Sequence, residues 1–408
     1  MKRPLSTSSS SADPWRLLLR VLLFLAPLLL SWGGLEWILW RTGESWTVAK
    51  VHRWQDTQGG LFGRQLLSQQ FNLYKMAGIV RRRPDVLVLG SSRMMQIRGL
   101  MFGKNVSFYN AGGLLQQLAD LEAVAGLLRE GRLPKPRVAL VGIDPWWLKP
   151  QQEGEPSWLL GDVSDAATSL AARGRVVREL LRHPRRLLEA LTLAIEFPAG
   201  GGRGYAGLAA GFSGGGFRPD GSRLYYREVS EYEQTGAYRD RESPRVIDRV
   251  RAQSRQFAPP LTVDKTRLHR CIAALTTIGD LGMEVIAMSP PFSDEVVAAL
   301  NSDEASRQWW AIVSTHVPDS LRAAGFSTIA LQRPADDGFD DRYMLDGFHP
   351  GEVLMAHVVA RMLQTASPKS FFARLEPPAQ TPHSELSLLR PDRRLPFAGL
   401  AAGRSASP

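Results

Sequence analysis

Residues 86–89 form an uninterrupted apolar run, VLVL, between Asp85 and a Gly-Ser-Ser turn. A strand without polar residues on either face is typical of a parallel sheet that helices cover on both sides. Further strands are expected at 106–109, 137–143, 283–288 and 326–331, and helices at 114–129, 266–281, 306–324 and 351–365. This alternation predicts an α/β domain with a doubly wound, mostly parallel sheet and helices on both faces.

Two short motifs in this pattern supply a hydroxyl, a carboxylate and an imidazole. Ser91 and Ser92 follow the first strand directly, while Asp346 and His349 form an Asp-x-x-His motif before the last helix. Sites in parallel α/β sheets lie beyond the carboxyl ends of the strands, so we expect both motifs on one rim. Each motif alone also has a structural explanation, either a turn or a helix cap with a surface histidine. Their joint occurrence favours a functional site.

Ser92, His349 and Asp346 are the residue types that nucleophilic acyl chemistry needs. A serine hydroxyl requires a base within hydrogen-bond reach, which His349 can supply, and Asp346 can fix the tautomer of that base. The backbone N–H of Ser92 and the glycine-containing turn at 110–113 are candidate donors to an oxyanion. Arg93 either adds positive charge at this point or is a surface arginine.

The first 45 residues indicate the compartment. Residues 21–40 carry one charge, Glu36, and are long enough to cross a bilayer as a helix. Lys and Arg residues precede this run, so the N-terminus is expected in the cytoplasm and the rest of the chain outside. No Ala-x-Ala-like site follows the run, which favours an uncleaved anchor over a cleaved signal peptide. We therefore expect a single-pass protein of the inner (cytoplasmic) membrane with a periplasmic domain.

Net charge and cysteine content limit the kinds of binding partner and cofactor that are expected. The formal net charge is +10, and outside the membrane its expected counterparts are anionic lipid headgroups or an acidic cell-surface polymer rather than nucleic acid. A solvated arginine face explains the same excess. The single cysteine, Cys271, lies in an apolar helical stretch and is expected in the core. Cysteines and histidines are too few and scattered for a metal or redox motif, so no metal and no cofactor are expected.

Composition divides the chain into segments. The expected parts are a cytoplasmic tail at 1–14, a transmembrane anchor at 15–40, a tether at 41–83 with a helix at 64–80, the α/β domain at 84–366 with an insertion at 151–260, and a disordered tail at 367–408. The insertion holds arginine-rich helical pieces and a glycine-rich run at 200–216. This run lacks the ending of a phosphate loop and is expected to be flexible. We expect the insertion to cover the sheet edge or the site.

The segments DVLVLGSSR, FYNAGG and DGFHP together resemble the first, second and fifth blocks of the SGNH (GDSL-like) hydrolase superfamily. The closer likeness is to its membrane-anchored branch, which is related to alginate O-acetylation proteins and the D-alanyl-lipoteichoic acid transfer protein. The resemblance covers residues 70–365. The roles that it implies are Ser92 as nucleophile, His349 as base, Asp346 as the partner of that base, and Gly112 or Gly113 as an N–H donor to the oxyanion.

One position departs from the pattern of that superfamily. Its third block offers an asparagine side chain to the oxyanion, whereas the equivalent segment here, GIDP, carries Asp144. A carboxylate repels an oxyanion unless it is protonated or turned away. The oxyanion hole is therefore expected to use another donor or to be weakened. Trp146 and Trp147 follow, and they either line an acyl or sugar site or belong to the core.

The resemblance implies an extracytoplasmic acyltransferase or esterase that works through an acyl-serine intermediate, with O-acetylation of a cell-surface polysaccharide as the expected reaction. It also implies a multi-span membrane-bound O-acyltransferase as a partner that delivers the acyl group. The alternative is a catalytically weak scaffold of the same fold that binds polysaccharide or an assembly partner, and the departure at Asp144 favours it. A plain hydrolase with water as the acceptor uses the same residues as the transferase.

Overall fold

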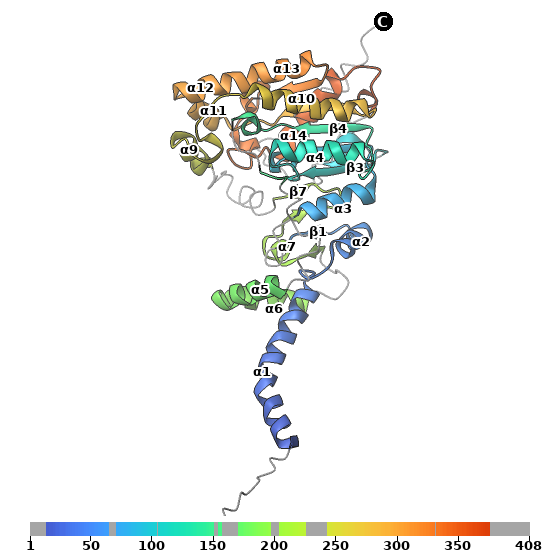
Figure 1. The fold of residues 1–408 in the computed structure, drawn as a ribbon, viewed down its shortest axis with the longest axis vertical. Coiled ribbons are helices and arrows are strands. Elements are labelled where there is room, and N and C mark those ends of the chain that lie inside the picture. The colour runs from blue at the N-terminus through green and yellow to red at the C-terminus, as the bar shows by residue number, and fades with distance from the viewer. Residues whose placement is uncertain are drawn as a thin grey trace, which may run out of the picture.

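The computed structural model describes residues 14–64, 71–103, 105–150, 154–156, 170–196, 204–225, 243–330 and 332–375. Residues 1–13 of the expected cytoplasmic tail, part of the insertion, and residues 376–408 of the expected disordered tail lie outside these residues. An α/β domain occupies one end of the described chain, and the long N-terminal helix α1 (Pro14–Arg41) projects from the other end (Figure 1).

A five-stranded sheet forms the centre of the α/β domain. Its strand order is β3-β2-β4-β8-β9, and each neighbouring pair is parallel. The strands are β2 (Val86–Gly90), β3 (Phe108–Gly112), β4 (Val138–Gly142), β8 (Glu284–Ser289) and β9 (Ser327–Ala330). Every residue of β2, β3 and β4 is buried, as the continuous apolar runs predict for β2 and β4, while β3 was expected at 106–109 and instead spans 108–112. The predicted α/β class and parallel sheet are confirmed.

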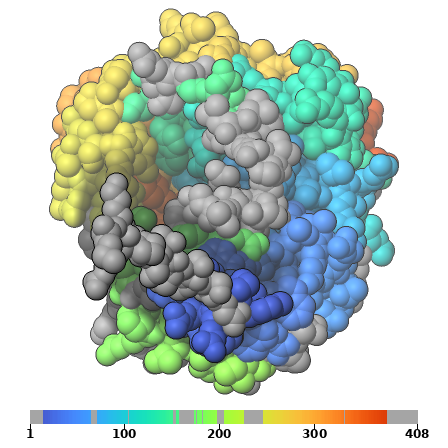
Figure 2. Space-filling model, turned by 60° about the horizontal axis from the view of Figure 1, so that its bottom comes forward, coloured from blue at the N-terminus to red at the C-terminus, as the bar shows by residue number. Residues whose placement is uncertain are grey.

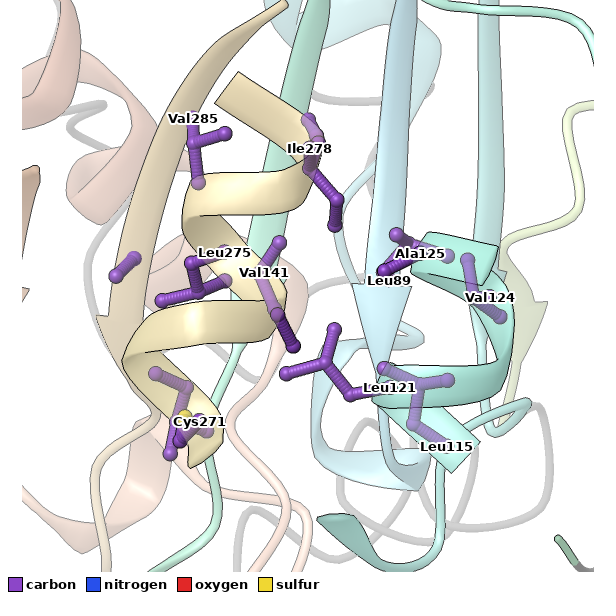
Figure 3. Close-up of a cluster of buried hydrophobic side chains, with 14 of the residues drawn as sticks. Leu89, Leu115, Leu121, Val124, Ala125, Val141, Cys271, Leu275, Ile278 and Val285 are labelled. Atoms are coloured by element: carbon purple, nitrogen blue, oxygen red, sulfur yellow. The ribbon is translucent and has the colours of Figure 1, made fainter. Parts of the chain in front are cut away.

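Helices pack on both faces of this sheet, because successive strand residues point to opposite sides. On one face α4 (Leu118–Arg129) and α10 (Lys265–Asp280) cover Leu89 and Val141 (Figure 3). On the other face α14 (Glu352–Thr365) covers Val86 and Val88. The remaining helices of the domain are α9 (Ser243–Arg251), α11 (Asp294–Asn301), α12 (Glu304–Ala311) and α13 (Val317–Ala323). Cys271 of α10 is buried in the core, as predicted.

Three segments of the chain differ from the prediction. Helix α4 begins at Leu118 rather than at Leu114, because the N–H groups of Gly113 and Leu115 donate to the Gly90 carbonyl and keep this segment in a turn. A π-helical turn at 312–316 divides the helix expected at 306–324. Residues 367–375, expected in the disordered tail, instead pack on the core through Phe372 and Leu375, because burial of these apolar side chains orders the segment.

The strand order of the central sheet reverses at β2. From β2 the chain passes to β3 on one side, and β4 then lies on the other side of β2. The loops that follow β2 and β4 therefore diverge, and such a reversal is where α/β sheets form their sites. Ser92 follows β2 at this edge, and Asp144 follows β4.

A second, smaller sheet joins the tether to the insertion. Its strand order is β5-β1-β6-β7, and the strands are β1 (Leu61–Phe62), β5 (Tyr205–Ala206), β6 (Gly216–Phe217) and β7 (Arg223–Leu224). The glycine-rich run is therefore ordered over 204–216, contrary to the prediction of a flexible loop, and includes α7 (Leu208–Ser213). Its glycines permit close packing, since a Cβ at Gly207, where φ is +90°, would collide with the Gly63 carbonyl.

The described residues of the tether include two helices, α2 (Val48–Gln58) and α3 (Asn72–Arg82), of which only the second was predicted. Below them, α1 has 28 residues and a mean hydropathy of 1.9 in its most apolar window, so it is long and apolar enough to cross a membrane. Two helices of the insertion, α5 (Leu170–Arg182) and α6 (Pro184–Glu196), lie across the end of α1 that meets the tether (Figure 1).

Candidate active site

Ser92, His349 and Asp346 form a continuous hydrogen-bonded chain. The Oγ atom of Ser92 lies 2.8 Å from Nε2 of His349, and Nδ1 of His349 lies 2.6 Å from Oδ2 of Asp346. The serine and the histidine are separated by 257 positions in the sequence. All three side chains are partly accessible to solvent. The structure therefore brings together the three residues that the sequence singled out, at distances that proton transfer requires.

The end of strand β2 directs the Ser92 hydroxyl toward the histidine. Gly90 has a φ of +148° and sits against Gly142 and the Met94 side chain, so only glycine fits here. The Ser91 hydroxyl then accepts the N–H of Arg93 at 3.3 Å and caps a 3₁₀ turn over Ser92–Met94. Ser92 is the first residue of this turn, and its Oγ atom lies 2.8 Å from Nε2 of His349.

Asp346 holds its own loop and the histidine at the same time. Its Oδ1 atom accepts the N–H groups of Phe348 and His349, both at 2.7 Å, while Oδ2 faces the imidazole. Burial alone would raise the pKa of Asp346, but the histidine and these two N–H groups together lower it below its ordinary value. Asp346 therefore stays ionised opposite the ring. It does not cap the last helix, because α14 begins at Glu352 with Gly351 as its N-cap.

Arg93 and Asp144 form a buried ion pair, so Arg93 is not a surface arginine. Nη1 of Arg93 lies 2.9 Å from Oδ1 of Asp144, and each side chain is 1% exposed. Arg93 also donates to the carbonyls of Phe348 at 3.2 Å and of Pro291 at 3.0 Å. Burial raises the pKa of Asp144, and the adjacent guanidinium opposes that rise. Asp144 is thus turned toward Arg93, which resolves the repulsion that its carboxylate would otherwise exert on an oxyanion.

The two glycines expected to supply an oxyanion N–H use these groups within the protein. The Gly112 N–H donates to Oδ1 of Asn110 at 2.7 Å, and the Gly113 N–H donates to the Gly90 carbonyl at 2.8 Å. Their expected role is therefore not supported in this conformation. The Ser92 N–H has no acceptor among the residues that the structure describes. With the N–H groups of Gly112 and Gly113 engaged, the Ser92 N–H is the candidate backbone donor to the oxyanion that remains.

Asn110 is a residue whose role the sequence did not reveal. Its side chain is fully buried, and its Nδ2 donates to the carbonyls of Met94 at 2.8 Å and Ile97 at 2.7 Å. These bonds fix the loop that follows the candidate nucleophile. An asparagine side chain can donate and accept hydrogen bonds at the same time. Here Nδ2 donates to the two carbonyls, while Oδ1 accepts the N–H of Gly112.

Aromatic side chains surround the Arg93 guanidinium and the loop of the histidine. Arg93 lies 4.1 Å from the Phe292 ring centroid and 5.6 Å from that of Trp146. Phe348 stacks on Phe257, with the centroids 5.8 Å apart. Trp147, in contrast, is fully buried in the core beneath α4 and α10. Of the two tryptophans considered for a binding role, only Trp146 borders the site.

The insertion reaches the site through residues 218–225. The Tyr225 ring lies 6.2 Å from the His349 ring, and the Arg223 guanidinium lies 4.6 Å from the Tyr225 centroid. The buried carboxylate of Glu352 anchors this segment through Arg218, at 2.6 Å, and also pairs with Arg98 at 3.2 Å. No local sequence signal marks Tyr225, because its place beside the histidine depends on how the insertion folds back.

Among the described residues, no group of three or more His, Cys, Asp or Glu side chains could hold a metal ion. Comparison with protein-family models, with curated proteins and with solved structures finds no match to this chain.

Proposed function

We propose that this protein is a serine acyltransferase or esterase of the SGNH type, which carries an acyl group, acetyl in the first instance, on Ser92. The observation that carries the proposal is the continuous chain from Ser92 Oγ through His349 to Asp346, with contacts of 2.8 and 2.6 Å. Its position at the reversal of strand order, beyond the carboxyl ends of β2 and β4, is additional support.

The proposed reaction has two halves. In the first, Nε2 of His349 takes the proton of the Ser92 hydroxyl as Oγ attacks the acyl carbonyl, and the imidazolium then protonates the leaving group. In the second, His349 takes a proton from the acceptor hydroxyl, which attacks the acyl-serine, and the imidazolium then returns that proton to Oγ of Ser92 as the acyl–oxygen bond breaks. The ionised Asp346 stabilises the imidazolium in both halves. The N–H of Ser92 is the proposed donor to the oxyanion.

The proposed setting is a membrane surface. We infer that α1 anchors the protein in the inner membrane with the α/β domain on the outer side, and that a cell-surface polysaccharide is the acceptor. A multi-span membrane-bound O-acyltransferase is the proposed source of the acyl group. The apolarity and length of α1 support the anchor, and the net charge of +10 suits an acidic polymer or anionic lipid.

The second candidate function is a scaffold that keeps the fold and binds polysaccharide or an assembly partner. One observation favours it, since both predicted glycine donors to the oxyanion are engaged inside the protein. A hydrolase with water as the acceptor would use the same three residues as the transferase. Labelling with an active-site probe separates the scaffold from either enzyme.

The test uses the full-length protein in detergent, a fluorophosphonate probe and p-nitrophenyl acetate. Expected results are a covalent adduct on Ser92 and esterase activity, with both lost in Ser92→Ala and the activity reduced at least ~10³-fold in His349→Ala. Ser327→Ala, on the exposed end of β9, is the matched serine control and should behave as the parent. If the parent forms no adduct, the enzyme proposal fails and the scaffold remains.

A further inference from the structure

Helix α6 exposes an apolar stripe next to the candidate membrane helix. Leu188, Leu191 and Ile195 are 64%, 37% and 63% exposed, and their spacing of three and four positions places them on one face. The buried positions of the same helix, Ala190 and Ala194, face α1 and α5 instead. This helix therefore has an apolar surface beyond the one that its packing uses.

The last turns of α1 fix where α5 and α6 lie. Leu35, Ile38 and Leu39 of α1 form one buried cluster with Val176, Leu180, Ala190 and Ala194 of the two helices. Arg41 donates to the Ala194 carbonyl at 3.1 Å, and Arg173 forms an ion pair with Glu36. Figure 2, turned so that the α1 end comes forward, shows green atoms of the insertion beside the blue N-terminal atoms. Both helices thus meet α1 where its apolar run ends.

This end of α1 has the composition of a membrane–water boundary. Trp32, Trp37 and Trp40 are exposed there, and tryptophan is enriched at that depth in membrane proteins. Residues 170–196 hold six arginines against three glutamates. Arg178, Arg182 and Arg185 are among the exposed ones. A basic helix pair with an exposed aliphatic stripe is the pattern of helices that lie in the interface plane of an anionic membrane.

We propose that α5 and α6 lie in the headgroup layer of the membrane that α1 crosses, with Leu188, Leu191 and Ile195 among the acyl chains. The occupant of the stripe is lipid, because α6 packs on α1, and α1 exposes an apolar surface of its own that includes Leu28, Leu29 and Leu30. This inference rests on the proposed anchoring by α1. It adds a second membrane contact that fixes the orientation of the domain, since one helix alone leaves rotation about its axis free.

The chain is well suited to a test by site-directed spin labelling, because Cys271 is its only cysteine and is buried. In a Cys271→Ala background, single cysteines replace Leu188, Leu191 and Ile195 and carry a nitroxide. The full-length protein is placed in nanodiscs of phosphatidylcholine and phosphatidylglycerol. Collision rates with oxygen, which is enriched in lipid, and with a water-soluble nickel complex are then measured. Glu189→Cys is the matched control on the polar face of α6, Glu304→Cys is the aqueous reference, and Leu28→Cys reports on α1.

We expect the ratio of oxygen to nickel collisions to be several-fold higher at 188, 191 and 195 than at 189 and 304. Equal ratios at the five positions, with lipid exposure at 28, would overturn the inference and leave the anchoring intact. Nickel access at 28 would instead show that the anchoring itself fails. Labels at 188, 191 and 195 that are shielded from both reagents would indicate a protein partner on the stripe and would also overturn the inference. Unchanged Tm values of the labelled variants show that the fold is retained.

Discussion

Arg93 and Asp144 pair at 2.9 Å in the interior of the α/β domain, each with 1% of its side chain exposed. Arg93 immediately follows Ser92, and Asp144 follows the neighbouring strand β4. The same guanidinium binds the carbonyl of Phe348, the residue before His349. One buried cation therefore connects the segments that carry the serine and the histidine, and sets their separation without contacting either side chain.

We predict that Asp144→Asn lowers the free energy of unfolding by about 3–5 kcal/mol, because it leaves the Arg93 cation buried without its counter-charge. Replacing both residues, as in Arg93→Met with Asp144→Leu, should cost less than Asp144→Asn alone. Urea unfolding followed by circular dichroism measures each value. The matched control is Arg322→Ala, which removes an exposed pair with Asp319 and should cost less than ~1 kcal/mol. Equal stability of Asp144→Asn and the parent would contradict the argument.

The lowered pKa of Asp346 predicts a stability contribution that depends on pH. The carboxylate is favoured in the folded state, so its contribution is fully present above its ordinary pKa of 3.8 and is lost as pH falls through the lower folded value. Asp346→Asn should therefore be less stable than the parent at neutral pH, and the gap should close in acid. Unfolding free energies of both proteins across that range check the sign. If the parent remains more stable than Asp346→Asn below pH ~2, the difference comes from altered packing and not from the charge of Asp346.

Lys75 predicts that the stability of the protein also rises with pH in alkaline solution. Its ammonium is fully buried and donates to the carbonyls of Asn110 and Gly221, and burial lowers its pKa well below 10.5. The unfolded chain then binds more protons than the folded one between the two pKa values, so stability rises with pH in that window. Measured from neutral pH to about pH 9, the parent should gain stability relative to Lys75→Met. Lys265→Met, which removes an exposed charge, is the control; a parent that tracks Lys75→Met at every pH would refute the prediction.

Two helical glycines should respond in opposite directions to alanine. A Cβ at Gly78 in α3 would overlap the fully buried Tyr109 ring, so Gly78→Ala should destabilise the protein by about 1–3 kcal/mol. At Gly126 in α4, an alanine methyl would meet no atom within 4 Å, and Gly126→Ala should stabilise by about 0.5–1 kcal/mol. Thermal unfolding gives the two shifts in Tm. A higher Tm for Gly78→Ala would show that packing at Gly78 is looser than the structure indicates, and a lower Tm for Gly126→Ala would contradict the second prediction.

The central sheet could be predicted because each of its buried strands can be recognised from a short stretch of sequence. Strands β2 and β4 are buried on both faces, so each appears as a run of apolar residues. The positions of Ser92 and His349 followed from a general rule about where strands of a parallel sheet end. Neither inference needed a contact between distant parts of the chain.

What could not be predicted depends on distant partners. The burial of Arg93 requires Asp144, 51 positions later, and carbonyls near 290 and 348, none of which its neighbours in sequence reveal. Strand β1 has two residues, too few for any periodicity, and its pairing with β5 and β6 is set by tertiary packing. The same holds for Tyr225, which reaches His349 only because the insertion returns to the domain.

The small sheet of β5, β1, β6 and β7 has a consequence for the order in which a growing chain can mature. Both neighbours of β1, strands β5 and β6, are synthesised long after it. The Gln55 side chain likewise donates to the Phe217 carbonyl, which lies 162 positions later in the chain. Strands β2, β3 and β4 can meet in that interval, since all three are synthesised before residue 205. Strand β1 is thus synthesised early, but its sheet forms only after β5 and β6 have been made. A nascent chain that ends before Phe217 therefore carries β1 with an unpaired edge.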